Sequence, residues 1–223
     1  MLTVPFLTGV VSGGASLVQV PLLIAWLSGY LLSYYALLAV KTRRLARVRR
    51  QVLTYAAILV PCALAVLIVR PELLLAAPVF AVLLAVNTAA AWRRTERSVV
   101  NDLASVLQSC LMVPLAAAAA GTPPVDVLRP TAAVLLYFVG TVLYVKTMIR
   151  ERGDRGYLRA SIGFHAAAVP VAAMLSPALA GPFLLFLCRA VWLPRRPMTP
   201  RRVGFLEIAN CVLLVAVIAI SRR

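Results

Sequence analysis

The sequence has 223 residues, of which 62% are hydrophobic and only 13% are charged. A soluble domain carries about 25% charged residues, and a disordered chain has low hydrophobicity, so both classes are excluded. The composition instead predicts an all-α, polytopic transmembrane helical bundle that forms one integral membrane domain over residues 1–223.

Apolar runs of about 20 residues mark candidate spans, because a helix of that length crosses about 30 Å of hydrocarbon. The chain has nine such candidates, two of them short, so we predict eight to nine spans, with the seventh broken by Pro170 and Pro177. In order, the runs are Met1–Val11, Leu17–Val40, Val52–Val69, Leu73–Trp92, Val99–Ala120, Pro130–Ile149, Leu158–Ala180, Pro182–Leu193 (short) and Val203–Ile220.

The first run is too short to cross a membrane alone, and it lacks the basic start and the cleavage site of a signal peptide. It is either a half-helix or the end of a first span truncated at the N-terminus, and we favour the second interpretation. Three glycines, Gly9, Gly13 and Gly14, lie in this run or just after it. We expect them to form a turn rather than a helix-packing motif.

Basic residues gather in alternate loops. Nineteen of the 23 Lys and Arg residues lie in residues 41–50, 93–97, 146–159 and 189–202, whereas the intervening loops hold only Arg70 and Arg129. Since Lys and Arg concentrate on the cytoplasmic side of a cell membrane, these four regions and the N-terminus are predicted to be cytoplasmic. The C-terminus is then predicted outside, an assignment that Arg222 and Arg223 oppose.

The net charge of +16 has two interpretations. The basic loops either fix the topology and contact anionic membrane lipids, at about 1 kcal/mol per residue near the surface, or hold a phosphate-bearing ligand. Nucleic-acid binding is not expected, because the charge is divided among short loops without a nucleic-acid motif. The four cysteines lie singly in apolar runs and indicate neither a disulfide framework nor a metal site.

Polar residues at membrane depth need a partner or a function, because burying them in lipid is costly. Asn101 and Asp102 open the fifth span, where Asp102 suits either a helix cap or a cavity shared with the loop after the sixth span. Asn87 and Gln108 are interpreted as groups that form interhelical hydrogen bonds, worth about 0.6 kcal/mol each.

The sixth span ends in the charged sequence YVKTMIRERGDR, residues 144–155. Lys146 and Arg150 are four residues apart and are predicted to share a helix face. Together with Tyr144, Glu151, Asp154 and Arg155, they hold an anion, or a cation bridged to an anion, or else form a helix end with solvated charges.

Two isolated ionisable residues have simpler interpretations. His165, the single histidine, is expected to hydrogen-bond a neighbouring helix. Glu207, near the start of the last span, is expected to pair with Arg201 or Arg202.

Three segments resemble the bacterial YwiC-like membrane protein family: residues 5–44, residues 84–103 (LAVNTAAAWRRTERSVVNDL) and residues 139–165 (VGTVLYVKTMIRERGDRGYLRASIGFH). The resemblance covers nearly the whole chain. Because the family has no settled biochemical role, it implies an architecture more than a function.

A weaker resemblance is to the UbiA-type prenyltransferases, nine-helix membrane enzymes in which carboxylates after the second and sixth helices hold Mg²⁺ against a pyrophosphate. Here the second span ends SYYALLAVKTRR without a carboxylate, whereas Glu151 and Asp154 follow the sixth. Arg94 and Thr95 match a basic–Thr element of those enzymes. The resemblance implies a UbiA-like arrangement without the first metal site, so no cofactor is expected, and Mg²⁺ only if the protein is a transferase.

The favoured function is binding of an anionic isoprenoid or lipid phosphate in a cytoplasm-facing basic cavity, as in a degenerate prenyltransferase. Alternatives are a small-solute or ion transporter, with helices broken at prolines, and a non-catalytic membrane subunit or assembly factor. The candidate residues for the anion or head group are Tyr34, Lys41, Arg43, Arg94, Asn101, Asp102, Tyr144, Lys146, Arg150, Glu151 and Asp154.

Overall fold

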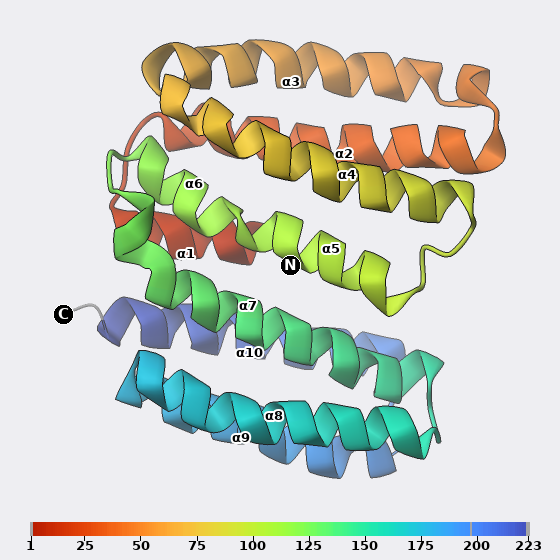
Figure 1. Cartoon of the computed structure of the whole chain (residues 1–223), viewed down its shortest axis with the longest axis vertical. Helices are drawn as coiled ribbons and strands as arrows, with labels where there is room; N and C mark the ends of the chain where they lie inside the picture. Colours follow the sequence, from red (N-terminus) through yellow and green to blue (C-terminus); the bar gives the residue numbers. More distant parts are fainter. Residues whose placement is uncertain (1, 197, 222–223) are drawn as a thin grey trace.

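The computed structural model describes residues 2–196 and 198–221, and these residues form helices joined by short turns (Figure 1). Nine helical segments run up and down the bundle, and α5 and α6 together make one of them. The helices are α1 (Thr3–Gly13), α2 (Gln19–Thr42), α3 (Arg49–Val69), α4 (Ala77–Trp92), α5 (Val99–Cys110), α6 (Met112–Ala119), α7 (Leu128–Val145), α8 (Arg155–Leu175), α9 (Ala180–Trp192) and α10 (Pro200–Ser221).

Eight of the described segments are long and apolar enough to cross a membrane, which confirms the predicted all-α, multi-pass architecture. Short 3-10 turns lengthen three of these spans at their N-terminal ends, Pro71–Ala76 before α4, Pro124–Val127 before α7 and Pro177–Leu179 before α9. α1 is shorter, and its 11 residues extend about 16 Å. The Trp26 Nε1 donates a hydrogen bond of 3.0 Å to the Leu2 carbonyl, so α1 begins beside the second turn of α2.

The boundary between the seventh and eighth spans differs from the prediction. Pro170 does not break the seventh span, because α8 continues through it to Leu175. The helix ends at Leu175, and Ser176 after it has an extended backbone, the conformation favoured for a residue that precedes proline. Pro177 then opens the next span, which is 19 residues long rather than short.

The fifth span is one segment with a one-residue interruption at Leu111. Pro114 explains the interruption, because it has no N–H to donate to the Cys110 carbonyl and its ring crowds that carbonyl.

Gly9 and Gly13 are packing residues of α1, so the expectation that they form a turn is wrong. A Cβ atom at Gly9 would lie 2.7 Å from the Ala116 Cβ, and one at Gly13 would overlap the backbone of Ala117 in α6. Glycines four apart let two membrane helices approach closely. Only Gly14, with φ of +94°, belongs to the turn.

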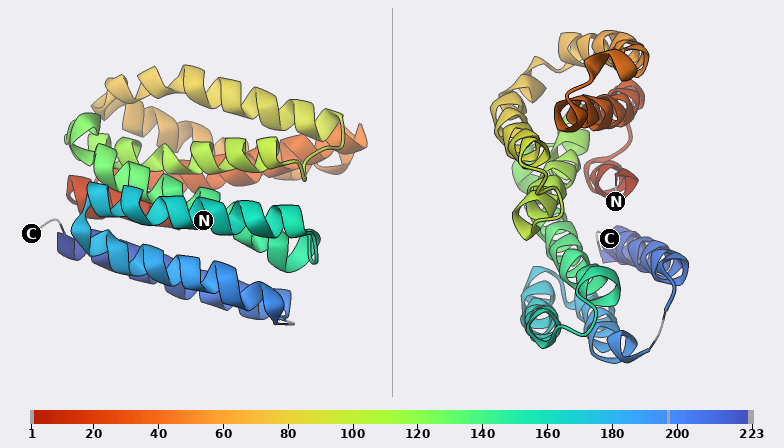
Figure 2. Two further views of the ribbon diagram at one scale, coloured as in Figure 1. Left: turned by 60° about the horizontal axis from the view of Figure 1, so that its bottom comes forward. Right: turned by 90° about the vertical axis from the view of Figure 1, so that its right-hand side faces the viewer.

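α7 lies at the centre of the bundle. Within its span, Pro124–Arg150, 61% of the residues in the apolar stretch are buried, the highest share among the eight spans. The end-on view in Figure 2 shows α2, α3 and α4 gathered on one side of α7 and α8, α9 and α10 on the other. The largest apolar core joins α7 to α8, α9 and α10 through side chains that include Phe138, Ala172, Phe183 and Leu214.

The α1–α6 contact yields a stability prediction. Gly13→Ala is expected to destabilise the protein by about 1–3 kcal/mol, because the added methyl group meets backbone that cannot move aside. The measurement is the thermal unfolding midpoint of the purified protein in mild detergent.

Gly163→Ala in α8 is the matched control, because a Cβ there meets nothing within 4 Å. Its midpoint should stay unchanged or rise slightly, since alanine favours a helix over glycine. Equal midpoints for the two variants would contradict the packing role of Gly13.

Candidate functional site

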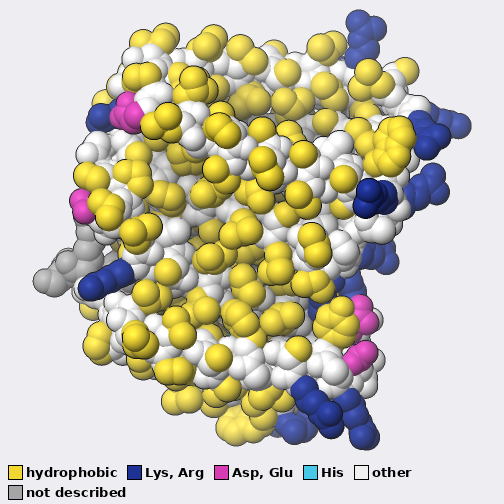
Figure 3. Space-filling model, in the orientation of Figure 1, with side chains coloured by type: hydrophobic (Ala, Val, Ile, Leu, Met, Phe, Trp, Pro, Cys, Tyr) yellow, Lys and Arg dark blue, Asp and Glu magenta, His cyan; other side chains and the backbone are white. Residues whose placement is uncertain are grey.

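The basic loops meet at one end of the bundle, as predicted from the alternation of charge. The α2–α3, α4–α5, α7–α8 and α9–α10 connections all lie at the right of Figure 1, and Figure 3 shows Lys and Arg side chains crowded along that edge. Among the described residues, three basic side chains of these regions form ion pairs with carboxylates. They are Lys41 with Glu96, Lys146 with Asp102, and Arg189 with Glu207. Most of the loop arginines are therefore available to attract anions.

The end of α2 and the α4–α5 loop form one cluster within this basic end. The Lys41 Nζ lies 2.7 Å from the Glu96 Oε1, and the Arg43 guanidinium lies 5.1 Å from the centre of the Trp92 ring. Arg43 and Arg94 both adopt left-handed backbone, with φ of 54° and 58°, which turns the chain out of α2 and α4. We call these five residues together with Arg93 the α2–α4 cluster.

The Lys41–Glu96 pair is sensitive to pH. The hydrogen bond from Lys41 lowers the pKa of the Glu96 carboxyl below its ordinary value of 4.5. A carboxylate with a lowered pKa stabilises the structure while it is charged. The link between α2 and the loop is therefore present at neutral pH and is lost as the pH falls through that lowered pKa.

A shallow groove runs along α4 and ends at this cluster. Its volume is about 660 Å³. The 12-residue distance from its first to its last lining residue corresponds to about 18 Å of helix. Small side chains leave the groove open, and its lining consists of Ala81, Leu84, Ala85, Thr88, Ala89, Trp92 and Arg93. A shallow apolar groove that ends in a tryptophan and an arginine matches the order of a lipid tail and its head group.

Lys146 and Asp102 form a second, deeper element of the site. The Lys146 side chain is buried, and its Nζ lies 2.9 Å from the Asp102 Oδ2 and donates a 2.7 Å hydrogen bond to the Arg97 carbonyl. Both contacts tie α7 to the α4–α5 loop and the start of α5. Lys146 therefore holds the loop in place with its charge already matched.

Asn101 completes the attachment of the loop. Ser98 is the N-cap of α5 and accepts a hydrogen bond from the Asn101 N–H, so Asp102 is not the capping residue. The Asn101 Nδ2 donates to the Glu96 carbonyl at 2.9 Å. Its Oδ1 is buried and has no hydrogen-bond partner among the described residues.

The remaining predicted residues lie apart from the α2–α4 cluster. Lys146–Arg150 is a π-helical turn in which Lys146 is buried and Arg150 is exposed. The two side chains therefore do not share one face, contrary to the prediction from their four-residue spacing. Asp154 caps α8 by accepting hydrogen bonds from two backbone N–H groups. Glu151 is half-buried at the end of this turn, and Tyr34 is exposed on α2 against Tyr35.

Tyr144 faces a buried ion pair that the sequence interpretation missed. The Arg189 guanidinium lies 4.5 Å from the centre of the Tyr144 ring and pairs with the Glu207 carboxylate. Glu207 also accepts hydrogen bonds from the Tyr137 hydroxyl at 3.0 Å and the Thr141 hydroxyl at 3.1 Å. We call this group the α7–α9–α10 cluster.

The prediction that Glu207 pairs with Arg201 or Arg202 is therefore wrong. Arg201 instead lies over the Phe205 ring and Arg202 is exposed, whereas Arg189 reaches Glu207 from the last turn of α9. Arg189 stands alone in the apolar run FLLFLCRAVW, and a lone cation inside a span requires a buried acid. That signal is present in the sequence, although the charge pattern alone assigns Arg189 to the basic loop that follows.

Two smaller predictions have opposite outcomes. The Asn87 Nδ2 donates to the Gln108 Oε1 at 3.2 Å, which confirms the interhelical hydrogen bond between α4 and α5. The His165 Nδ1 instead lies 2.7 Å from the carbonyl of Ser161 in its own helix, and its ring packs beside Gly140 of α7. A glycine offers no side-chain partner, so the expected bond to another helix does not form.

The buried pair yields a second stability prediction. Arg189→Ala is expected to cost about 3–5 kcal/mol, because it leaves the Glu207 carboxylate buried without a counter-charge. The double variant Arg189→Ala/Glu207→Gln should recover part of that loss, since no uncompensated charge remains. Denaturant unfolding in detergent measures both, and a single variant as stable as the parent would contradict the role of the pair.

Comparison with known proteins places the chain in a family. A family model described as YwiC-like protein matches residues 1–117. The uncharacterised protein YwiC of Bacillus subtilis is 30% identical over 99% of this chain and 93% of its own length. An uncharacterised protein of Haemophilus influenzae is 32% identical over 94% of this chain and 89% of its own length. No solved structure matches the chain. The chain therefore belongs to the YwiC-like family and has the architecture of a multi-pass membrane protein.

Proposed function

We propose that the protein binds an anionic lipid phosphate, with an isoprenoid phosphate as the favoured class, at its basic end. The observation that carries this proposal is the junction of the α4 groove with the α2–α4 cluster. The groove ends at Trp92 and Arg93, and Arg43 lies over the Trp92 ring. An apolar chain along α4 would therefore bring a phosphate to several exposed arginines.

The chemistry of the cluster suits a phosphate. Guanidinium groups donate paired hydrogen bonds to phosphate oxygens, and Arg43, Arg93 and Arg94 are all exposed there. Lys41 is held by Glu96, which keeps the end of α2 beside the loop. Lys146 positions the same loop from α7 and is not proposed to touch the ligand.

We place the basic end in the cytoplasm on the positive-inside rule. Four basic connections lie at that end, whereas Arg70 and Arg129 are the basic residues of the loops that lie opposite. A phosphate bound there would come from a lipid of the cytoplasmic leaflet.

A UbiA-like arrangement with a transfer reaction would extend this proposal from binding to catalysis. Glu151 and Asp154 are the carboxylates that would have to hold Mg²⁺. Asp154 already accepts two hydrogen bonds as the cap of α8, so it would have to leave that role. The binding proposal stands on the arginines and the groove without this step.

The first test removes the charges at the end of the groove. Arg43→Gln/Arg93→Gln is expected to reduce the retained lipid phosphate at least tenfold, because each charge-assisted hydrogen bond contributes about 1.5–3 kcal/mol. The measurement is native mass spectrometry of the mildly solubilised protein, with the bound lipid then identified.

The control Arg152→Gln/Arg155→Gln removes the same charge from the α7–α8 connection and should retain the lipid. Equal loss of lipid phosphate in both variants would show that the basic end attracts anionic lipids in general and has no specific site in the α2–α4 cluster. If a second protein stays bound and no lipid phosphate is found, the result would favour the role of an accessory subunit instead.

A second test fills the groove without changing charge. Ala85→Phe places a ring in the groove and is expected to reduce lipid retention severalfold in the same measurement. Val82→Phe is the matched control on the same helix, because Val82 is 64% exposed and does not line the groove. Full retention by Ala85→Phe would show that the lipid chain does not lie along α4.

Transport of a small solute or ion is the second candidate, and the α7–α9–α10 cluster is the observation that favours it. Ionisable side chains inside membrane spans often mark a solute or proton path, and Glu207 gathers three hydrogen-bonding partners there. Flux into proteoliposomes that Glu207→Gln abolishes would support transport over lipid binding.

A further inference from the structure

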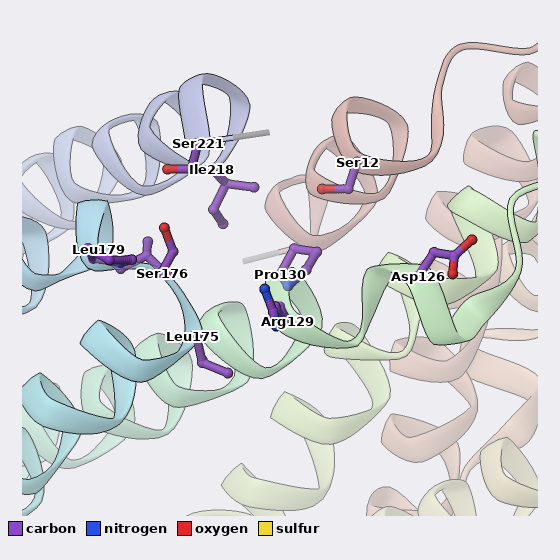
Figure 4. Close-up of a pocket in the computed structure, with 10 residues that line it drawn as sticks. Ser12, Asp126, Arg129, Pro130, Leu175, Ser176, Leu179, Ile218 and Ser221 are labelled. Carbon is purple, nitrogen blue, oxygen red and sulfur yellow. The ribbon is translucent and has the colours of Figure 1, made fainter. Parts of the chain in front are cut away.

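A second cavity lies at the end of the bundle opposite the basic loops. It has a volume of about 260 Å³ and is lined by the last turn of α1, the start of α7, the α8–α9 turn and the end of α10 (Figure 4). Its polar lining includes Ser12, Arg129, Ser176 and Ser221, and its apolar lining includes Leu175 and Ile218. This cavity shares no lining residue with the α4 groove.

Arg129 supplies a cation without a counter-charge in the described part of the chain. It forms no ion pair there, although it stands in the cavity wall. Arg70, at the same end of the bundle, is engaged instead, since its Nε donates to the Ala119 carbonyl and its Nη1 lies 3.7 Å from Glu72. The lining also includes Asp126, but Figure 4 shows its carboxylate turned away from Arg129 and Ser12.

Ser12 supplies an independent sign of a ligand. Its side chain is 6% exposed, lines the cavity, and its hydroxyl has no hydrogen-bond partner among the described residues. A buried hydroxyl without a partner costs free energy, so a group that accepts its proton is favoured. Ser176 adds a second hydroxyl from the α8–α9 turn, whereas the Ser221 hydroxyl donates to the Val217 carbonyl.

Two helix starts strengthen the preference for an anion. Arg129 and Pro130 belong to the first turn of α7, and Pro177 opens the turn that leads into α9. All three residues line the cavity, so the positive ends of these segments lie at its wall.

We infer that this cavity binds a small oxyanion, a carboxylate or a phosphate, with Arg129 as its counter-charge and Ser12 as a hydrogen-bond donor. The apolar wall of Leu175, Leu179 and Ile218 suits an oxyanion that carries a short aliphatic part. The same chemistry is found in a free anion and in the phosphate of a lipid head group, which can reach the cavity from the membrane surface.

The test measures binding to the full-length protein in a nonionic detergent after lipid removal. Sodium acetate, sodium phosphate and dioctanoyl phosphatidate are titrated separately at constant ionic strength, and the thermal unfolding midpoint is followed. We expect saturable stabilisation, with the apparent Kd raised at least tenfold in Arg129→Gln and severalfold in Ser12→Ala. Arg159→Gln removes one exposed charge at the other end and should leave the Kd unchanged.

The probes distinguish the sources of the oxyanion. Binding of acetate or phosphate that depends on Arg129 supports a free anion, and binding of phosphatidate alone with the same dependence supports a lipid head group. No saturable binding, or equal affinity in the parent and Arg129→Gln, would overturn the inference. Because phosphatidate can also bind the proposed lipid site, it is titrated into Arg43→Gln/Arg93→Gln, in which the part of the binding that depends on Arg129 should remain. The outcome is then separate from that of the proposed lipid site.

Discussion

The charges buried around α7 must find partners inside the bundle, because lipid offers none. On one side of α7, Lys146 meets Asp102 and the Arg97 carbonyl; on another, Thr141 joins Glu207 and Arg189. The first set holds α5 and the loop before it, and the second holds α9 and α10. The position of α7 thus sets where both halves of the molecule can lie, and the lipid-facing surfaces can remain apolar.

The two proposed anion sites lie at opposite ends of the molecule and differ in the features that would attract an anion. At the basic end, arginines from several loops provide charge on an open surface, and the groove along α4 provides a place for an apolar chain. At the other end, Arg129 and the buried Ser12 hydroxyl line a partly open cavity. Affinity at the basic end, where several exposed charges take part, should therefore fall more steeply with salt.

The sequence predicts the spans well because membrane helices must be long and apolar, and the alternation of basic loops marks which ends lie together. The Asn87–Gln108 bond was predictable because two amides at membrane depth on adjacent helices have few other partners. The role of Gly9 was not, because it depends on which helices become neighbours. Glycines at this spacing occur both in turns and at helix contacts, and only the approach of α6 identifies the contact.

The π-helical turn at Lys146–Arg150 has a consequence for how this region can change. The Glu151 N–H donates to the Lys146 carbonyl five residues earlier, so the turn holds one residue more than an α-helical turn would. Deleting any one residue would restore the α-helical pattern and shorten the connection from α7 to α8 by one residue. The start of α8 would then be drawn out of its present contacts. This segment should accept substitutions of its exposed side chains far more readily than a change in its length.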